Sequence, residues 1–452
     1  MTSPFTQRLR HTLERFGPRR ALVCAATGRA LSFDDMEREA RAMATGHAFA
    51  RIAGRVTLLR LDNGLSWPVA FLALRHAGAV VVPVDADTPD AALPELAQRL
   101  RAVGILDAGG LRPTSIRAGA RPRELLLGKL TSGSTGAPKA HFFTEAQMLA
   151  DGDAVCAAMG IGPDDLNHAG LPFGHSYALG NLILPLFACG VPLSVASSHF
   201  PGVIAEEIAR RSATVLPTVP ALIAALHRSA IPPEKLASLR RVISAGARLD
   251  PADALAFSQK FSRRVHNFYG SSETGGIAFD TAGFDTLSGA SVGRLLPGVS
   301  AERMRDGRLV VSGPAVRTHG NPRRRSGWGA HPMTDLGRVD EDARVRLEGR
   351  LPSLIKIGGR RINPAEVERA LLALPGVREA FVAAAPGPGG EPRLAALVSG
   401  GTSDPRALRA ALRERLPAWK IPARLASLPA FPLTARGKAD RAALIRLLEE
   451  ES

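Results

Sequence analysis

The chain of 452 residues has three cysteines, few aromatic side chains and no long apolar run. Cys24, Cys156 and Cys189 form no metal-ligand spacing, and such an odd, sparse set argues against a disulfide framework and for a reducing compartment. The N-terminal residues are basic but contain no apolar core of signal-peptide length. The most apolar stretch, residues 181–196, is interrupted by proline and glycine and is too short to span a bilayer. We predict that it forms buried strand and turn in a soluble, cytoplasmic protein.

Lysine is scarce among the many cationic residues. Lysine and arginine together number 58 against 42 acidic residues, a net charge of +16, but only seven of these cations are lysines. The arginines are scattered along the whole chain, and the aromatic residues, 5% of the total, are not interleaved with them as in surfaces that stack nucleic-acid bases. We therefore expect no nucleic-acid partner and no membrane insertion. With 45% apolar and 22% charged residues, the chain can bury a core.

Helical and strand patterns alternate over roughly the first 290 residues. Ser32 is a candidate N-cap with Asp35 three residues later, which predicts the start of a helix. Apolar runs at residues 55–61, 79–84 and 214–219 are typical of buried strands. This alternation predicts an α/β fold with a mostly parallel sheet.

The pattern changes after about residue 293, where short strands predict a small β unit. From residue 352 on, strand and helix patterns share about 100 residues, enough for a small α+β domain. We therefore predict a large N-terminal lobe of parallel α/β subdomains plus the small β unit over residues 1–351. A small, mobile α+β domain is predicted over residues 352–452.

The most informative segment is Lys129-Leu-Thr-Ser-Gly-Ser-Thr-Gly-Ala-Pro-Lys139. Its backbone N–H groups, hydroxyls and terminal lysine suit anionic oxygens, although the spacing does not fit the Walker A pattern. A loop built only for flexibility would not need a Pro-Lys pair behind an apolar strand. We therefore predict a phosphate-binding loop that comprises Thr131, Ser132, Gly133, Ser134, Thr135, Gly136 and Lys139.

Three later segments add weaker signals. In Asn267-Phe-Tyr-Gly-Ser-Ser-Glu-Thr-Gly-Gly276, Tyr269 can offer a ring face to a base and Glu273 can offer a carboxylate to Mg²⁺. Asp335, in Met-Thr-Asp-Leu-Gly-Arg, has a carboxylate suited to a ribose diol. The last segment, Pro-Leu-Thr-Ala-Arg-Gly-Lys, ends at Lys438. Singly, each would be an ordinary polar loop.

Together and in this order, the segments resemble the motifs of the adenylate-forming (AMP-binding) superfamily. This superfamily contains acyl- and aryl-CoA synthetases, firefly-type luciferases and the adenylation domains of peptide synthetases. The segment from Tyr269 to Glu273 matches the Tyr-Gly-x-Thr-Glu signature, with Ser272 in place of threonine. The resemblance covers nearly the whole chain and implies an AMP-forming acid–thiol ligase.

The resemblance implies two half-reactions and assigns residues to them. A carboxylate attacks the α-phosphate of Mg·ATP to give acyl-AMP and pyrophosphate, and a thiol then displaces AMP. Lys139, His175, Glu273 and Lys438 would be the catalytic residues, with Glu273 also the Mg²⁺ ligand. Besides the phosphate loop, nucleotide binding is assigned to Gly246, Ala247, Tyr269, Gly270, Ser272, Asp335 and Arg350.

The acyl pocket is predicted from Leu-Pro-Phe-Gly-His-Ser-Tyr-Ala-Leu, residues 171–179, which resembles a segment of coumarate- and hydroxybenzoate-type ligases. His175 would flank the carboxylate, and Tyr177 and Gly180 would shape the pocket. Gly174 or a neighbour stands where amino-acid-activating relatives have an aspartate. Since a buried ammonium without a partner is costly, we expect a non-amino acid, aryl or medium-chain acyl.

Two departures from the family pattern concern the loop and the hinge. Ala140-His141 replaces the usual Gly-Val after the loop lysine, which puts only the local backbone path in question. Pro352 stands at the hinge about which the C-terminal domain rotates in relatives, and a proline restricts such rotation. Gly358 and Gly359, in the segment that lines the thiol tunnel of relatives, are retained, so we expect a slow but real thioester step.

The acceptor and the partners stay open at this stage. CoA is the expected thiol, and the phosphopantetheine of an acidic carrier protein is the alternative, since both are anionic and the chain is basic. A catalytically impaired nucleotide-binding or carrier-docking protein is the alternative of another class, although the motif residues are retained. The sequence predicts no oligomeric state.

Overall fold

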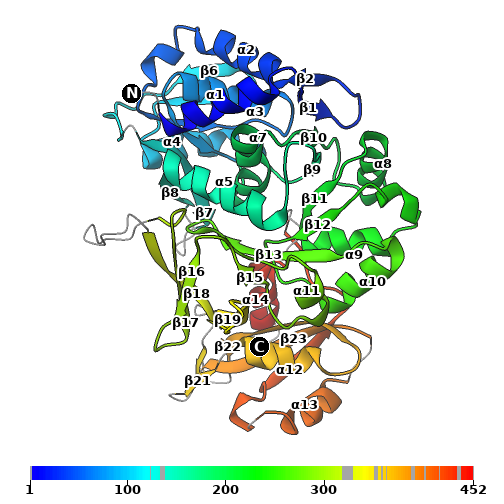
Figure 1. Cartoon of the computed structure of the whole chain (residues 1–452). Coiled ribbons are helices and arrows are strands. Elements are labelled where there is room, and N and C mark those ends of the chain that lie inside the picture. The colour runs from blue at the N-terminus through cyan, green and yellow to red at the C-terminus, as the bar shows by residue number, and fades with distance from the viewer. Residues whose placement is uncertain are drawn as a thin grey trace. The chain divides into compact units, whose positions relative to one another are not determined.

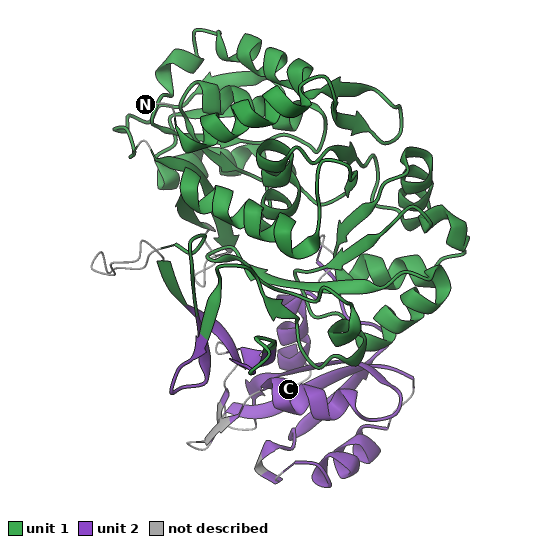
Figure 2. Ribbon diagram, in the orientation of Figure 1, with its two compact units in different colours: residues 1–301, 311–331, 341–345 green, residues 302–310, 332–340, 346–452 purple. Residues whose placement is uncertain are grey.

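The structure, a computed structural model, describes residues 3–122, 124–132, 138–317, 329–350, 355–357, 360–362, 364–387, 392–401, 404–416, 418–434 and 439–450. Internal contacts divide the chain into two compact units (Figure 2). Unit 1 comprises residues 1–301, 311–331 and 341–345, and unit 2 comprises residues 302–310, 332–340 and 346–452. The expected boundary at Pro352 lies outside the described residues and stays a prediction.

A six-stranded sheet in unit 1 has the strand order β6-β5-β3-β4-β7-β8. Its central pairs are parallel, and its two edge pairs are antiparallel. Its strands are β3 (Val56–Leu59), β4 (Val80–Pro83), β5 (Gly104–Asp107), β6 (Gly110–Pro113), β7 (Leu125–Ser132) and β8 (Pro138–Thr144).

A second, nine-stranded sheet has the order β15-β14-β13-β12-β11-β9-β10-β1-β2. The run from β13 to β1 is parallel, and the strands at both edges are antiparallel. The strands are β1 (Arg20–Cys24), β2 (Ala30–Ser32), β9 (Asn167–Ala169), β10 (Leu193–Val195), β11 (Val215–Thr218), β12 (Arg241–Ser244), β13 (Val265–Ser271), β14 (Gly275–Phe279) and β15 (Arg294–Leu295).

Helices of unit 1 connect and cover these strands (Figure 1). They are α1 (Pro4–Phe16), α2 (Phe33–Ala44), α3 (Ser66–His76), α4 (Leu93–Leu100), α5 (Glu145–Met159), α6 (Ser176–Ala178), α7 (Leu184–Cys189), α8 (Pro201–Arg211), α9 (Pro220–Arg228), α10 (Pro251–Phe261) and α11 (Phe284–Ser288). Among the described residues, the largest core cluster joins side chains of both sheets with those of α3, α5 and α7. Within it, the Phe71 ring stacks on those of Trp67 and Phe187, at centroid distances of 5.7 and 5.6 Å.

The α/β fold class is confirmed, as is the helix start at Ser32. The Ser32 hydroxyl accepts from the Asp35 N–H, and the Asp35 carboxylate accepts from the Ser32 N–H, which forms a capping box for α2. The expectation for residues 181–196 was wrong in its first part. A π-helical turn, Leu179–Ile183, continues into α7, and only β10 is strand. This stretch is buried on nearly all sides, so its apolar pattern has no period that separates helix from strand.

A four-stranded sheet with the order β16-β17-β18-β19 crosses the division between the units. Its strands are β16 (Ser300–Arg303), β17 (Arg308–Gly313), β18 (Gly329–Val339) and β19 (Val345–Arg350). The rest of unit 2 holds the hairpin β20 (Ile355–Ile357) and β21 (Arg360–Ile362) and a sheet of β22 (Val377–Pro386), β23 (Pro392–Gly400) and β24 (Arg424–Leu428). Its helices are α12 (Pro364–Leu372), α13 (Pro405–Arg413) and α14 (Arg441–Glu450).

Candidate active site

The hairpin of β7 and β8 carries the predicted phosphate loop. Thr131 lies opposite Lys139 in the antiparallel register, and Ser132 lies opposite Pro138. Lys139 is exposed, and the Thr131 Oγ1 is 3.4 Å from the Lys139 carbonyl oxygen. The pairing therefore brings the two ends of the loop together. Gly133, Ser134, Thr135 and Gly136 lie outside the described residues.

The turn between β13 and β14 carries the segment with Tyr269 and Glu273. The Ser271 hydroxyl accepts from the backbone N–H groups of Glu273 and Thr274, each at 3.2 Å, which fixes the turn. A Cβ on Gly270 would lie 2.6 Å from the Gly275 carbonyl oxygen, so this position requires glycine. The Glu273 side chain is 25% exposed. The turn thus presents one partly exposed carboxylate.

An imidazole lies beside this carboxylate. His141, on β8, places its Nε2 3.6 Å from Glu273 Oε1 and 3.1 Å from Thr131 Oγ1. Arg317 Nη1 donates to His141 Nδ1 at 3.1 Å. Burial lowers the pKa of His141, and the neighbouring cations lower it further against the opposing effect of Glu273. Sequence reasoning noted His141 only as a departure from the family pattern and gave it no role.

A buried ion pair lies next to the same turn. Lys129 Nζ lies 3.7 Å from Asp151 Oδ2, and the two side chains are 2% and 4% exposed. Burial lowers the pKa of Lys129, while Asp151 opposes this effect. Asp151 Oδ1 accepts from the Gly276 N–H at 2.8 Å, and a Cβ on Gly180 would lie 3.3 Å from Asp151 Oδ2. Sequence reasoning missed this pair, for which a lysine on an otherwise apolar strand was the available signal.

The predicted acyl-pocket residues lie close to the same turn. The Ser176 hydroxyl donates to Ser272 Oγ at 2.7 Å, and His175 Nε2 lies 2.7 Å from Asp85 Oδ1. The Tyr177 hydroxyl donates to the Ile243 carbonyl oxygen at 3.1 Å. Burial raises the pKa of Tyr177. The Tyr177 hydroxyl is therefore engaged with the backbone of β12.

The predicted adenine-binding residues follow the carboxyl ends of two neighbouring parallel strands. Gly246 and Ala247 follow β12 after one intervening residue and are exposed, and Tyr269 is half-buried near the end of β13. Gly246 has a φ of +85°, which favours glycine. Ligands of open α/β sheets bind outside the carboxyl ends of the strands, so this placement suits a nucleotide.

The predicted ribose-binding residues lie in unit 2. Arg350 Nε donates to Thr334 Oγ1 at 2.9 Å and lies 3.5 Å from Asp335 Oδ1. The Asp335 side chain is 16% exposed and that of Arg350 is 66% exposed. The structure therefore brings Asp335 and Arg350 together. Lys438, Pro352, Gly358 and Gly359 lie outside the described residues.

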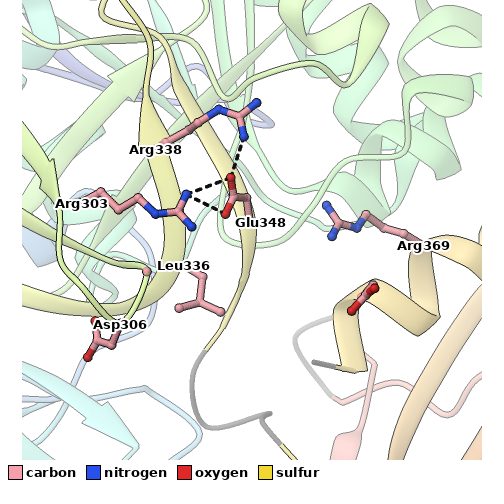
Figure 3. A pocket seen from close by; sticks show the side chains of 8 residues that line it. Arg303, Asp306, Leu336, Arg338, Glu348 and Arg369 are labelled. Atoms are coloured by element: carbon pink, nitrogen blue, oxygen red, sulfur yellow. Dashed lines mark hydrogen bonds and ion pairs between the residues drawn. The ribbon is translucent and has the colours of Figure 1, made fainter. Parts of the chain in front are cut away.

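Unit 2 also contains a cavity of about 410 Å³ that holds none of the predicted site residues. Figure 3 shows Arg303 and Arg338 converging on Glu348, with Arg369 approaching from α12. The lining comprises three arginines, three acidic residues, a leucine and a glycine: Arg303, Arg338, Arg369, Asp306, Glu348, Glu366, Leu336 and Gly307. Its opposite charges balance, which gives no preference for an anion.

The donor groups of unit 1 fit Mg²⁺ and phosphate. Mg²⁺ is usually bound by one or two carboxylates together with substrate phosphates, and the partly exposed Glu273 carboxylate is a ligand of this kind. Among the described residues, no cluster of three or more His, Cys, Asp or Glu side chains forms a complete metal cage. In the same part of the chain, no helix has the length and apolar character to cross a membrane.

Comparisons with known proteins identify the family of the chain. The family model described as AMP-binding enzyme matches residues 9–118 and 115–316, and that of the AMP-binding enzyme C-terminal domain matches residues 366–438. The chain therefore belongs to the AMP-binding enzyme family. The recognition of the adenylate-forming superfamily is confirmed, and with it the enzyme class, an AMP-forming acid–thiol ligase.

Individual relatives are similar over most of the chain. Feruloyl-CoA synthase of an Amycolatopsis species is 29% identical over 91% of this chain and 92% of its own length. The p-hydroxybenzoic acid–AMP ligase FadD22 of Mycobacterium tuberculosis is 32% identical over 70% of this chain and 47% of its own length. ATP-bound MatB from Rhodopseudomonas palustris has a TM-score of 0.83 at 22% identity, covering 98% of this chain and 99% of that one.

Proposed function

We propose that the protein activates a non-amino carboxylic acid, aryl or medium-chain acyl, with ATP and transfers the acyl group to CoA. The observation that carries this proposal is the contact between the predicted acyl-pocket and phosphate-binding segments. The hydrogen bond from Ser176 to Ser272 joins the residue after His175 to the residue before Glu273. Within unit 1, an acid beside His175 and a nucleotide phosphate beside Glu273 would therefore be neighbours.

The first half-reaction joins an anion to a polyanion, so cations and N–H donors must screen the repulsion and hold the in-line geometry. Thr131, Ser272 and Lys139 supply two hydroxyls and one ammonium for the β- and γ-phosphates of ATP. Glu273 would hold Mg²⁺, which supplies positive charge against the phosphate oxygens. Lys438 is proposed, from its motif position, to neutralise the carboxylate and the α-phosphate in the transition state.

The second half-reaction transfers the acyl group from AMP to a thiol. We propose CoA as that thiol, with Gly358 and Gly359 beside its pantetheine arm and Asp335 and Arg350 on the ribose. Pro352 is proposed to slow this step by restricting domain rotation. Pro352→Asp should then accelerate thioester formation and leave acyl-AMP formation unchanged. Equal thioester rates in the two proteins would contradict the hinge proposal.

The electrostatics near the pocket support a substrate without an ammonium group. Among the described residues near the pocket, Asp85 is engaged by His175 and Asp151 by Lys129, and Glu273 is assigned to Mg²⁺. A Cβ on Gly174 would face the Val84 carbonyl oxygen and Pro83, not a charged group. An α-ammonium would thus lose its hydration without a free carboxylate to replace it. The names of feruloyl-CoA synthase and p-hydroxybenzoic acid–AMP ligase among the relatives support an aromatic acid.

Mass spectrometry of the products tests this proposal. The protein is incubated with Mg·ATP, CoA and a panel of aryl, medium-chain and amino acids. An acyl-CoA product from an aryl or medium-chain acid is expected. Acyl-AMP without acyl-CoA would instead favour a carrier protein's phosphopantetheine as the acceptor. Preferential activation of an amino acid, or ATP binding without any product, would overturn the proposal.

The Lys438→Ala variant tests the catalytic assignment. Loss of the ammonium should abolish pyrophosphate release while ATP still binds, because the lysine is assigned to the transition state rather than to the ground-state complex. Lys235→Ala is a matched control, since Lys235 is a partly exposed lysine paired with Glu206 outside the site. Undiminished pyrophosphate release by Lys438→Ala would contradict the assignment.

A further inference from the structure

We propose that His141 is a positioning residue of the adenylation site, which holds the Glu273 carboxylate and the Thr131 hydroxyl in the arrangement that receives Mg·ATP. This inference rests on the proposed function, since it assigns Glu273 and Thr131 to the metal and the phosphates. His141 lies on β8, while Glu273 lies in the turn after β13. One side chain therefore contacts both the phosphate-loop hairpin and the metal-binding turn.

The hydrogen bond from Arg317 fixes the direction of the imidazole. A guanidinium can only donate, so the Nδ1 of His141 must accept and the proton of the neutral ring must lie on Nε2. The Nε2–H then faces Thr131 Oγ1 at 3.1 Å and Glu273 Oε1 at 3.6 Å. The first is a hydrogen bond, and the second is an electrostatic contact with a carboxylate. His141 thus presents a donor where a metal ligand and a phosphate ligand meet.

The contact with Thr131 also determines where that hydroxyl can point. Since Thr131 Oγ1 accepts from His141, its own O–H is available to donate. The acceptor that the structure gives this O–H, the Lys139 carbonyl oxygen, is 3.4 Å away, which is long for a hydroxyl hydrogen bond. A phosphate oxygen at ordinary distance would be a better acceptor. His141 therefore prepares Thr131 to donate to an anion.

Arg317, the hydrogen-bond partner of the imidazole, is itself anchored by backbone hydrogen bonds. The backbone N–H of Arg317 donates to the Glu273 carbonyl oxygen at 3.3 Å. The carbonyl oxygen of the preceding residue, Val316, accepts from Gln147 Nε2 on α5 at 3.0 Å. Arg317 is thereby tied to the same turn whose carboxylate His141 faces. Each of the three segments, β8, the turn and the segment after β17, therefore contacts the other two.

A role in packing alone predicts a different response to mutation. Valine would fill part of the volume of His141, whose side chain is 6% exposed, but offers no acceptor to Arg317 and no donor to Thr131. Glutamine keeps both, with its carbonyl oxygen toward Arg317 and its amide N–H toward Thr131. Asparagine is too short to reach Thr131. Positioning through hydrogen bonds therefore predicts that glutamine replaces histidine best.

The affinity for Mg·α,β-methylene-ATP, measured by calorimetry without an acid so that no turnover occurs, tests the proposal. Changing a residue that orients a metal ligand typically costs 10- to 100-fold in affinity, so His141→Val should weaken binding by about this factor. His141→Asn should behave like His141→Val, and His141→Gln should recover most of the affinity. His47→Val, at an exposed histidine after α2, is the matched control and should bind as the wild type does.

A double-mutant cycle with Arg317→Met completes the test. Because Arg317 is proposed to act through His141, its effect should largely disappear in the His141→Val background. Additive losses, or wild-type affinity in both His141→Val and His141→Asn, would overturn the inference. If His141→Val does not fold, the comparison of the asparagine and glutamine variants decides the matter. Acid-dependent pyrophosphate exchange by the wild type is measured alongside, and its absence would overturn the proposed function itself.

Discussion

The ion pair of Lys129 and Asp151 in unit 1 and the cluster of Arg303, Arg338 and Glu348 in unit 2 use the same chemistry in different surroundings. The first pair is 2% and 4% exposed, whereas the side chains of the second are between 28% and 58% exposed. Desolvation costs several kcal/mol per buried ion, which only a close partner and further hydrogen bonds offset. Exposed pairs remain hydrated and contribute little. Burial, rather than the number of contacts, therefore separates the two groups.

The buried pair also connects parts of the site, which the exposed cluster does not. Asp151 accepts from the Gly276 N–H, three residues after Glu273, and lies beside Gly180 of the pocket segment. Lys129 is two residues before Thr131 on β7. In contrast, the arginines around Glu348 line a cavity without predicted site residues (Figure 3). We therefore predict that substitutions in the buried pair reduce stability strongly, and that substitutions in the exposed cluster have small effects.

Asp151→Ala should cause the largest loss of stability. Removing the carboxylate leaves the Lys129 ammonium buried without its partner, which costs about 3–5 kcal/mol in comparable buried pairs. Denaturant unfolding measures the change in the free energy of unfolding. The double variant Lys129→Met/Asp151→Ala should recover part of the loss, because no lone charge remains. A double variant less stable than Asp151→Ala would show that the pair does not act as a unit.

A buried histidine predicts that the stability depends on pH, with a change comparable in size to the loss expected for Asp151→Ala. His168 on β9 is fully buried, has no hydrogen-bond partner among the described residues, and burial lowers its pKa to about 4. As the pH falls below about 6.5, the unfolded imidazole gains a proton that the folded one does not bind until about pH 4. The unfolded state then binds more protons, so stability falls by up to about 3 kcal/mol between these pH values.

His168→Leu should reduce this slope, which unfolding curves between pH 4 and 7 would show. Burial also lowers the pKa values of His141 and His266, so part of the slope should remain. The exposed His47 is a matched position, and His47→Leu should leave the slope unchanged. An unaltered slope in His168→Leu would contradict the assignment of this titration to His168.

Tyr177→Phe should have a moderate effect on stability and a small one on substrate selection. The variant loses the hydrogen bond from the hydroxyl to the Ile243 carbonyl oxygen, a net loss of about 1 kcal/mol. The ring, which stacks on Phe268 at a centroid distance of 5.9 Å, is retained. The order of preference among acids, measured by pyrophosphate release, should therefore stay the same. A reordered preference would place the hydroxyl in contact with the substrate.

Glu348→Gln should have the smallest effect. Its partners Arg303 and Arg338 are 47% and 58% exposed, and exposed pairs contribute about 0–1 kcal/mol. Denaturant unfolding should therefore give a curve close to that of the wild type. A loss as large as that of Asp151→Ala would break the comparison between buried and exposed charges.

The sequence predicted the fold class and the order of the site segments, but not the contacts that organise them. The α/β alternation and the capping box at Ser32 are local patterns, which a sequence displays directly. The partners of Glu273 come from β8 and from the segment after β17, far apart in the sequence. His141 and Arg317 therefore gave no joint signal.

Burial explains the other differences between sequence and structure. The position of Lys129 on an apolar strand signalled a buried charge, but the sequence did not identify its partner, Asp151, which lies on another element, α5. Residues 181–196 were expected to be strand and turn, but they begin as helix. The prediction failed because a stretch that is apolar on all sides shows neither a helical nor a strand period. In both cases the structure depends on tertiary packing, which the local sequence pattern does not show.

Acid-dependent exchange of pyrophosphate into ATP tests the central claim, adenylation of a non-amino carboxylic acid, most directly. The wild type should exchange pyrophosphate with an aryl or medium-chain acid and not with amino acids. Glu273→Gln should sharply reduce the exchange, because the proposed Mg²⁺ ligand loses its charge, while Glu348→Gln should leave it intact. Exchange that prefers an amino acid, or no exchange with any acid while ATP binds, would contradict the account.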